Sequence, residues 1–75
     1  MKWYLIDSDD GIIDEAEKKV ILMYRYGFGP AKKCGKAYCV YKRTNDGIGG
    51  NYWIVKETDL KEEGFEWVLK EKDND

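Results

Sequence analysis

The chain has no histidine, a single serine and only two cysteines among its 75 residues. Histidine is the commonest general base and metal ligand, and it is the usual partner of a nucleophilic serine or cysteine. Two cysteines without histidine cannot complete a structural zinc site, which takes four such ligands. We therefore expect no catalytic residues, no metal site and no cofactor, and we expect a protein that is not an enzyme.

Long apolar runs are also missing. The longest uncharged apolar run, residues 20–24, is far shorter than the roughly 20 residues that span a bilayer. The first seven residues reach an acid without the apolar stretch of a signal peptide. We expect no membrane contact, a cytoplasmic location and reduced thiols at Cys34 and Cys39. On one extended strand these cysteines would lie too far apart to bond, so a disulfide is expected only if they flank a turn.

The length allows one domain over residues 1–75, at a size where burial only just offsets the loss of conformational entropy. Three Trp, six Tyr and two Phe supply large apolar surfaces, so a core is expected without disulfides. The acidic tail, residues 72–75, is expected to fray.

Clusters of β-branched and aromatic residues bounded by turn residues predict strands. They cover residues 2–6, 36–43, 51–57 and 65–71. A tight turn at Asp46-Gly47 would end the second strand. In the third strand, Ile54 and Val55 would face opposite sides of the sheet, as expected for alternation on a pleated strand.

Residues 9–27 fit two patterns. Ile12, Ile13, Ala16 and Val20 recur at helical spacing, and Gly27 would end a helix. Residues 20–26, however, are rich in strand formers. We predict at most one short helix or irregular turn near residues 12–18, followed by a strand over about residues 20–26. The expected fold class is mainly β, with a small α+β fold as the alternative. Four to five short antiparallel strands would form a small barrel or curled sheet.

Three segments in the second half resemble a known architecture. They are Gly35–Tyr41 (GKAYCVY), the turn at Gly47–Gly50, and Tyr52–Leu60 (YWIVKETDL). Together they resemble the central hairpin and closing turn of Src-homology-3-like and KOW-type small β-barrels. The resemblance covers residues 35–60 and implies a module that binds protein or nucleic acid, without naming a ligand.

Charge is segregated along the chain although the net charge is only −2. Residues 18–44 hold eight of the thirteen Lys and Arg residues and none of the acids. The acidic ends can fold over this basic middle and cancel its field. Alternatively, the molecule has a cationic face and an anionic face, each of which steers a partner of opposite charge. The sequence leaves both arrangements open.

The first hypothesis is a small non-enzymatic protein-binding module, an adaptor or an inhibitor. Trp, Tyr and Arg are the residue types that anchor protein interfaces. The predicted patch consists of whichever of five aromatic residues is exposed beside Arg25 or Arg43. These aromatic residues are Tyr24, Tyr26, Phe28, Tyr41 and Trp53. A variant is an acidic nucleic-acid mimic, as in small phage or mobile-element proteins that act against host defence proteins. Its acids would be Asp7, Asp9, Asp10, Asp14, Glu15 and Glu17.

The alternative hypothesis is nucleic-acid binding through the basic aromatic segment, residues 18–43. Lysines would neutralise phosphates while aromatic rings stack on bases. The cations are Lys32, Lys33, Lys36, Lys42 and Arg43, and the rings are Phe28, Tyr38 and Tyr41. A pI near 5.1 argues against a dedicated nucleic-acid binder, so protein binding ranks first. The oligomeric state stays open.

Overall fold

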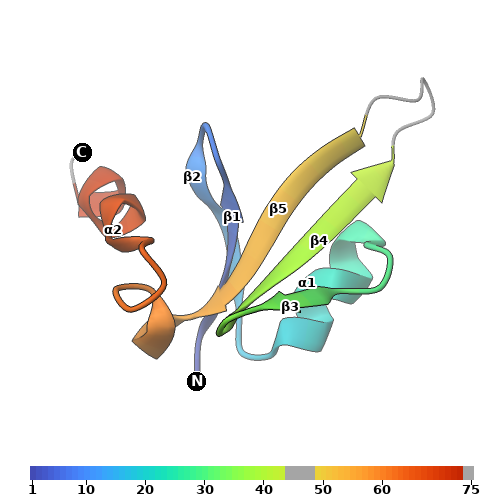
Figure 1. Cartoon of the computed structure of the whole chain (residues 1–75), viewed down its shortest axis with the longest axis horizontal. Coiled ribbons are helices and arrows are strands. Elements are labelled where there is room, and N and C mark those ends of the chain that lie inside the picture. Colours follow the sequence, from blue (N-terminus) through green and yellow to red (C-terminus); the bar gives the residue numbers. More distant parts are fainter. Residues whose placement is uncertain (44–48, 74–75) are drawn as a thin grey trace.

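The computed structural model describes the backbone of residues 1–43 and 49–73 and the side chains of residues 1–42 and 50–69. The strands are β1 (Trp3–Asp7), β2 (Gly11–Ala16), β3 (Lys32–Cys34), β4 (Ala37–Arg43) and β5 (Gly49–Lys56). The helices are α1 (Lys19–Tyr26), the 3-10 turn η1 (Glu57–Asp59) and α2 (Glu66–Asp73). Five antiparallel strands in one sheet confirm the predicted mainly β class (Figure 1).

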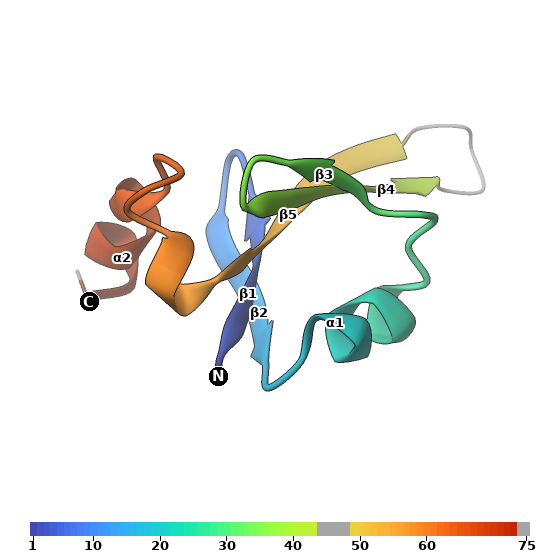
Figure 2. The ribbon, with the colours of Figure 1, turned by 60° about the horizontal axis from the view of Figure 1, so that its bottom comes forward.

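The order of the strands across the sheet is β2-β1-β5-β4-β3, so β2 and β3 are its edges. The sheet is open and strongly twisted (Figure 2), which is the curled-sheet form of the prediction. The predicted Asp46-Gly47 turn lies outside the described residues. The segments that resemble Src-homology-3-like barrels are β4, β5 and η1, and that resemblance stays a prediction.

Hydrophobic residues pack on both faces of the sheet. On one face Tyr4, Ile6 and Val55 pack with Val68 of α2. On the other face Leu5 and Ile54 pack with α1. The predicted alternation of Ile54 and Val55 is confirmed, since the two side chains belong to different clusters. One sheet therefore separates two small cores, each covered by one helix.

The prediction of a short helix or irregular turn near residues 12–18 is wrong, because strand β2 covers most of this segment. A bulge shifts the β1–β2 register, because Leu5 pairs with Asp14 while Ile6 pairs with Ile12. The extra residue, Ile13, is 39% exposed. Because a bulge inserts one extra residue, the alternation of side chains between the two faces of the sheet is interrupted there. Ile12 therefore joins the α2-side core, and the spacing that imitated a helix comes from the bulge.

Helix α1 replaces the strand predicted over residues 20–26, which is also wrong. Leu22, Met23 and Tyr26 follow helical spacing and pack against the sheet. The helix ends at Gly27, whose φ of 66° is left-handed and whose N–H donates to the Met23 carbonyl. The helical interpretation of this segment therefore predicted the correct end of the helix, at Gly27. Strand propensity, in contrast, predicted the wrong type of secondary structure.

Helix α2 replaces the strand predicted over residues 65–71. Phe65, Val68 and Leu69 are spaced by three and four residues, so they form a helical stripe on the α2-side core. The expectation of at most one short helix is therefore wrong. Because α2 extends to Asp73, the first half of the predicted frayed tail is helical. The last two residues lie outside the described part.

Candidate functional site

Helix α1 exposes apolar side chains on its outward face. Tyr24 is 89% exposed, Val20 is 62% exposed and Ile21 is 37% exposed, while Leu22 on the inward face is fully buried. The three exposed residues, together with Arg25, line a hollow of about 450 Å³. A surface helix normally places polar residues outward. We call Val20, Ile21, Tyr24 and Arg25 the α1 patch.

Asp14 holds α1 against the sheet. The Arg25 guanidinium donates a hydrogen bond of 2.6 Å to Asp14 Oδ2, and the Tyr26 hydroxyl donates to the same oxygen at 3.0 Å. The Arg25 hydrogen bond lowers the pKa of Asp14 below its usual range. Asp14 lies on the α1 side because of the bulge in β2. The backbone that carries the α1 patch is therefore fixed by a charged contact.

Aromatic rings below α1 support this helix from inside. Tyr26 and Phe28 stack with centroids 5.6 Å apart, and Phe28 contacts Tyr52 at 5.5 Å. All three are only partly exposed. The Lys42 ammonium lies 5.8 Å from the Tyr26 ring centroid. Of the predicted patch residues, Tyr24 and Arg25 thus face outward, whereas Tyr26 and Phe28 pack beneath them.

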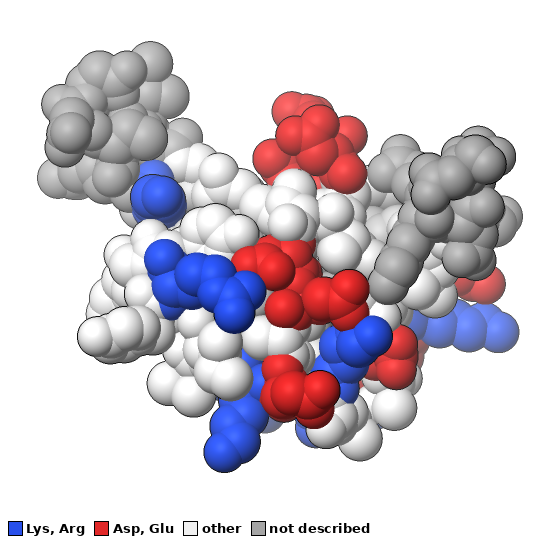
Figure 3. All heavy atoms as spheres, turned by 180° about the vertical axis from the view of Figure 1, so that it is seen from behind, with Lys and Arg blue, Asp and Glu red and all other residues white. Residues whose placement is uncertain are grey.

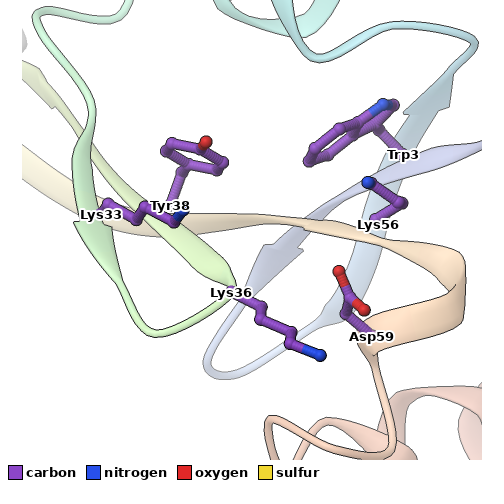
Figure 4. A pocket seen from close by; sticks show the side chains of 6 residues that line it. All are labelled: Trp3, Lys33, Lys36, Tyr38, Lys56 and Asp59. Carbon is purple, nitrogen blue, oxygen red and sulfur yellow. The ribbon is translucent and has the colours of Figure 1, made fainter.

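A second surface is a basic aromatic hollow of about 300 Å³ on the α1 side of the sheet (Figure 4). Its lining consists of Trp3, Lys33, Lys36, Tyr38, Lys56 and Asp59. The register explains this gathering, because Trp3 pairs with Lys56 and Lys33 pairs with Tyr38. Figure 4 shows the two aromatic rings on either side of the opening, with the Lys56 ammonium next to Trp3. We call this the Trp3–Tyr38 hollow.

Cations lie against both rings of this hollow. The Lys56 ammonium is 5.2 Å from the Trp3 centroid, and the Lys19 ammonium is 4.0 Å from the Tyr38 centroid. The two rings are 6.2 Å apart and tilted by 54°. Asp59 adds one negative charge to the lining. The hollow therefore combines aromatic faces with several ammonium groups, which suits an anionic ligand that carries a ring.

Lys36 is less available than the other lysines of the hollow. Its ammonium donates a hydrogen bond of 2.7 Å to Glu62, which raises the pKa of Lys36. In Figure 4 its side chain points away from the rings. Lys36 therefore ties the β3–β4 turn to the segment after η1 and contributes less charge to the hollow.

The rest of the predicted binding segment divides between the two faces of the sheet. Lys32 and Lys33 are neighbours on β3, so they point to opposite faces. Tyr41 is 44% exposed on β4. Arg43 ends β4, and its side chain lies outside the described residues. The basic segment is thus not one continuous surface.

Acids and cations from different blocks meet on the surface. Arg25 pairs with Asp14, and Lys36 pairs with Glu62. Figure 3 shows acidic side chains at the centre of one face with basic side chains beside them. Within the described part, the cations without an ion pair include Lys18, Lys33 and Lys42. This arrangement agrees better with partial cancellation than with two oppositely charged faces.

Six residues of these surfaces were absent from the predicted binding set. They are Trp3, Lys19, Val20, Ile21, Lys56 and Asp59. Val20, Ile21 and Tyr24 share one face of α1. Since Tyr24 was predicted, a correct assignment of this segment as a helix would have added Val20 and Ile21 to the predicted patch. Trp3 and Lys56 reach the hollow through strand pairing between distant segments, which the sequence does not display.

The fold defines a small antiparallel β domain with one helix on each face of a single sheet. Comparison with known protein families, curated proteins and solved structures finds no match. In the part that the structure describes, no group of three or more potential metal-ligating side chains gathers. No helix of this part is long and apolar enough to cross a membrane.

Proposed function

We propose that this chain is a small non-enzymatic protein-binding module, acting as an adaptor or an inhibitor, and that the α1 patch is its docking surface. One observation carries the proposal: the outward face of α1 is apolar, with Tyr24 89% exposed. An exposed apolar helix face is typical of docking into a groove on a partner protein. Tyrosine and arginine at adjacent positions are residue types that dominate binding energy.

Charge at the rim of the α1 patch indicates the kind of partner. Lys18 is exposed beside the patch, and Arg25, a member of the patch, is 49% exposed although it pairs with Asp14. A second copy of this chain, docked by the same face, would bring two copies of each cation together. An apolar groove edged by carboxylates would instead complement them. We therefore propose a different protein with an acidic-rimmed apolar groove as the partner.

The test compares Tyr24→Ser with Tyr41→Ser, since Tyr41 is an exposed tyrosine of the sheet away from α1. An extract of the cells in which the protein naturally occurs is passed over the immobilised wild-type protein and over both variants. Bound proteins are quantified by mass spectrometry. We expect Tyr24→Ser to lower capture of the specific partner by at least tenfold, because losing an aromatic anchor costs about 2 kcal/mol or more. Tyr41→Ser should retain it.

Two results would contradict the proposal. Equal capture by both variants would show that the α1 patch is not the docking surface. Concentration-dependent dimerisation that Tyr24→Ser abolishes would make the occupant a second copy. Circular dichroism of each variant confirms that the fold is intact before binding is compared.

The variant hypothesis of an acidic nucleic-acid mimic, as in phage proteins that act against host defence proteins, has weaker support. Three of its six acids are in intramolecular ion pairs, since Asp14 pairs with Arg25, Glu15 with Lys2 and Glu17 with the N-terminal ammonium. Asp9 and Asp10 of the β1–β2 turn remain exposed. The docking form through α1 is therefore preferred.

A second candidate function is binding of single-stranded nucleic acid at the Trp3–Tyr38 hollow. The supporting observation is that two aromatic rings and the ammonium groups of Lys33 and Lys56 line one cavity of about 300 Å³. Bases stack on aromatic rings, and lysines neutralise the adjacent phosphates.

Lys32 and Lys33 provide a matched pair for testing this candidate, because they adjoin on β3 and only Lys33 lines the hollow. Binding of labelled oligonucleotides and of free mononucleotides is measured at two salt concentrations. We expect Lys33→Ala to weaken binding and to reduce the salt slope by about 1, while Lys32→Ala leaves both nearly unchanged. Equal losses would indicate non-specific attraction, and no binding would remove the candidate.

A further inference from the structure

Cys34 and Cys39 lie on neighbouring strands, on either side of a two-residue turn at Gly35–Lys36. Gly35 has a φ of 67°, which suits glycine at the first central position of a tight hairpin turn. The register pairs Cys34 with Ala37, so Cys39 is the diagonal neighbour of Cys34 on the same face. This is the condition under which the sequence allows a disulfide.

The two sulfurs are in direct contact. The Cys39 thiol donates to Cys34 Sγ at 2.9 Å, and a disulfide needs about 2.05 Å. The sulfurs are thus already close, and because diagonal cross-strand neighbours lie about 7–8 Å apart, closure also requires movement of the hairpin backbone. Strand β3 has three exposed residues at the edge of the sheet, so the movement falls on a segment with little packing to lose.

The turn itself is held in place. Lys36 binds Glu62 at 2.7 Å, and a Cβ on Gly35 would collide with the Glu63 carboxylate. These contacts anchor the hairpin to the segment between η1 and α2. The fold therefore keeps the two thiols together when the pair is reduced.

The two thiols differ in access to solvent. Cys34 is exposed, whereas Cys39 is partly buried. The hydrogen bond to Cys34 raises the pKa of the Cys39 thiol, with burial adding to the effect. Cys34 is therefore the sulfur that a reagent reaches first, and Cys39 lies behind it. Lys32 lies on the same face as the two thiols, because it pairs with Cys39, and its charge favours the approach of an anion.

We propose that Cys34 and Cys39 form a reversible thiol–disulfide exchange site for low-molecular-weight anionic disulfides, of which oxidised glutathione is the probe. The Cys34 thiolate attacks one sulfur of oxidised glutathione, forms a mixed disulfide and expels one glutathione thiolate. The Cys39 thiolate then attacks Cys34 Sγ, closes the protein disulfide and expels the second glutathione. Two protein thiols are oxidised, one small disulfide is reduced, and the two thiol protons end on the two glutathiones.

The first experiment equilibrates the whole chain with glutathione buffers of graded ratio, both folded and in concentrated urea. Intact mass gives the fraction that has lost two hydrogens, and peptide mapping locates the bond. We expect the folded chain to favour the bond at least tenfold over the unfolded chain, a shift of about 30 mV to lower potential. Equal equilibria, or two glutathione adducts without an internal bond, would overturn the proposal.

The order of attack is tested by two matched variants. Cys39→Ser should accumulate a stable mixed disulfide on Cys34, because the resolving sulfur is gone. Cys34→Ser should react more slowly, because Cys39 is partly buried. Raising the salt concentration should slow the reaction of Cys39→Ser, since Lys32 attracts the anionic reagent. Equal adduct rates in the two variants would contradict the assigned roles. None of these measurements involves the α1 patch or the Trp3–Tyr38 hollow.

Discussion

Asp14 couples helix α1 to the sheet through one carboxylate oxygen. That oxygen accepts hydrogen bonds from Arg25 at 2.6 Å and from the Tyr26 hydroxyl at 3.0 Å. The Asp14 side chain is 22% exposed and that of Arg25 is 49% exposed, so solvent screens the pair. An ion pair of this exposure contributes up to about 1 kcal/mol. It also connects the backbone of α1, which carries Tyr24, to strand β2.

Asp14→Asn removes the charge while keeping the shape of the side chain, and we expect it to lower the free energy of unfolding by up to about 1 kcal/mol at neutral pH. The pKa of Asp14 is lower in the folded chain than in the unfolded chain. Its contribution is therefore complete above the unfolded pKa of about 3.9 and is lost as pH falls below it. Urea unfolding of both proteins between pH 7 and pH 3 measures this difference.

The control for this prediction is Asp10→Asn, at an exposed position in the turn between β1 and β2. The same chemical change there should leave stability nearly unchanged at every pH. A wild-type advantage over Asp14→Asn that persists unchanged at pH 3 would show that packing, and not charge, accounts for the role of Asp14.

At the scale of elements, β1, β4 and β5 were predictable because their residues combine strand propensity with alternation. These are the central strands, so tertiary packing agrees with local preference there. Strand β3 has only three exposed residues, two of them lysines, and no pattern of its own. It exists because the Gly35–Lys36 turn returns the chain along β4, which sequence composition does not reveal.

The exchanged assignments of residues 11–26 have two physical causes, one for each element. A bulge breaks the period-two pattern of β2, and tertiary packing overrides the strand propensity of α1. In α1 the stripe that packs inward consists of Leu22, Met23 and Tyr26, while equally apolar residues face outward. A helix that is apolar on both sides has no clear periodic signal. The feature that hid α1 from sequence reasoning is the same feature that motivates the docking proposal.

The candidate surfaces were predictable to different degrees. Tyr24 and Arg25 stand out by residue type, so the sequence placed them in a binding patch. The Trp3–Tyr38 hollow depends on strand pairing between Trp3 and Lys56, which are more than fifty residues apart. The contact between Cys34 and Cys39 depends on a two-residue turn that the sequence left undecided. Long-range register, and not local composition, supplies what was missing.

At the scale of the whole molecule, one sheet serves two cores that cannot form separately. Leu5 packs toward α1, while Tyr4 and Ile6 pack toward α2. Neither helix has enough apolar partners without the sheet, and the sheet without helices would expose both faces. A domain of this size has a total stability of roughly 4–11 kcal/mol. We therefore expect the two halves to unfold together.

Leu22→Ala and Leu60→Ala test this coupling, because they make the same change in opposite cores at fully buried positions. Each should lower the free energy of unfolding by about 2–5 kcal/mol through lost burial and a residual cavity. If the sheet couples the cores, urea curves followed by circular dichroism and by tryptophan fluorescence will coincide in both variants. If Leu22→Ala instead loses helical signal well before tryptophan fluorescence changes, α1 unfolds on its own. The α1 patch would then be a surface that orders only when a partner binds, and the preorganisation attributed to Asp14 would be wrong.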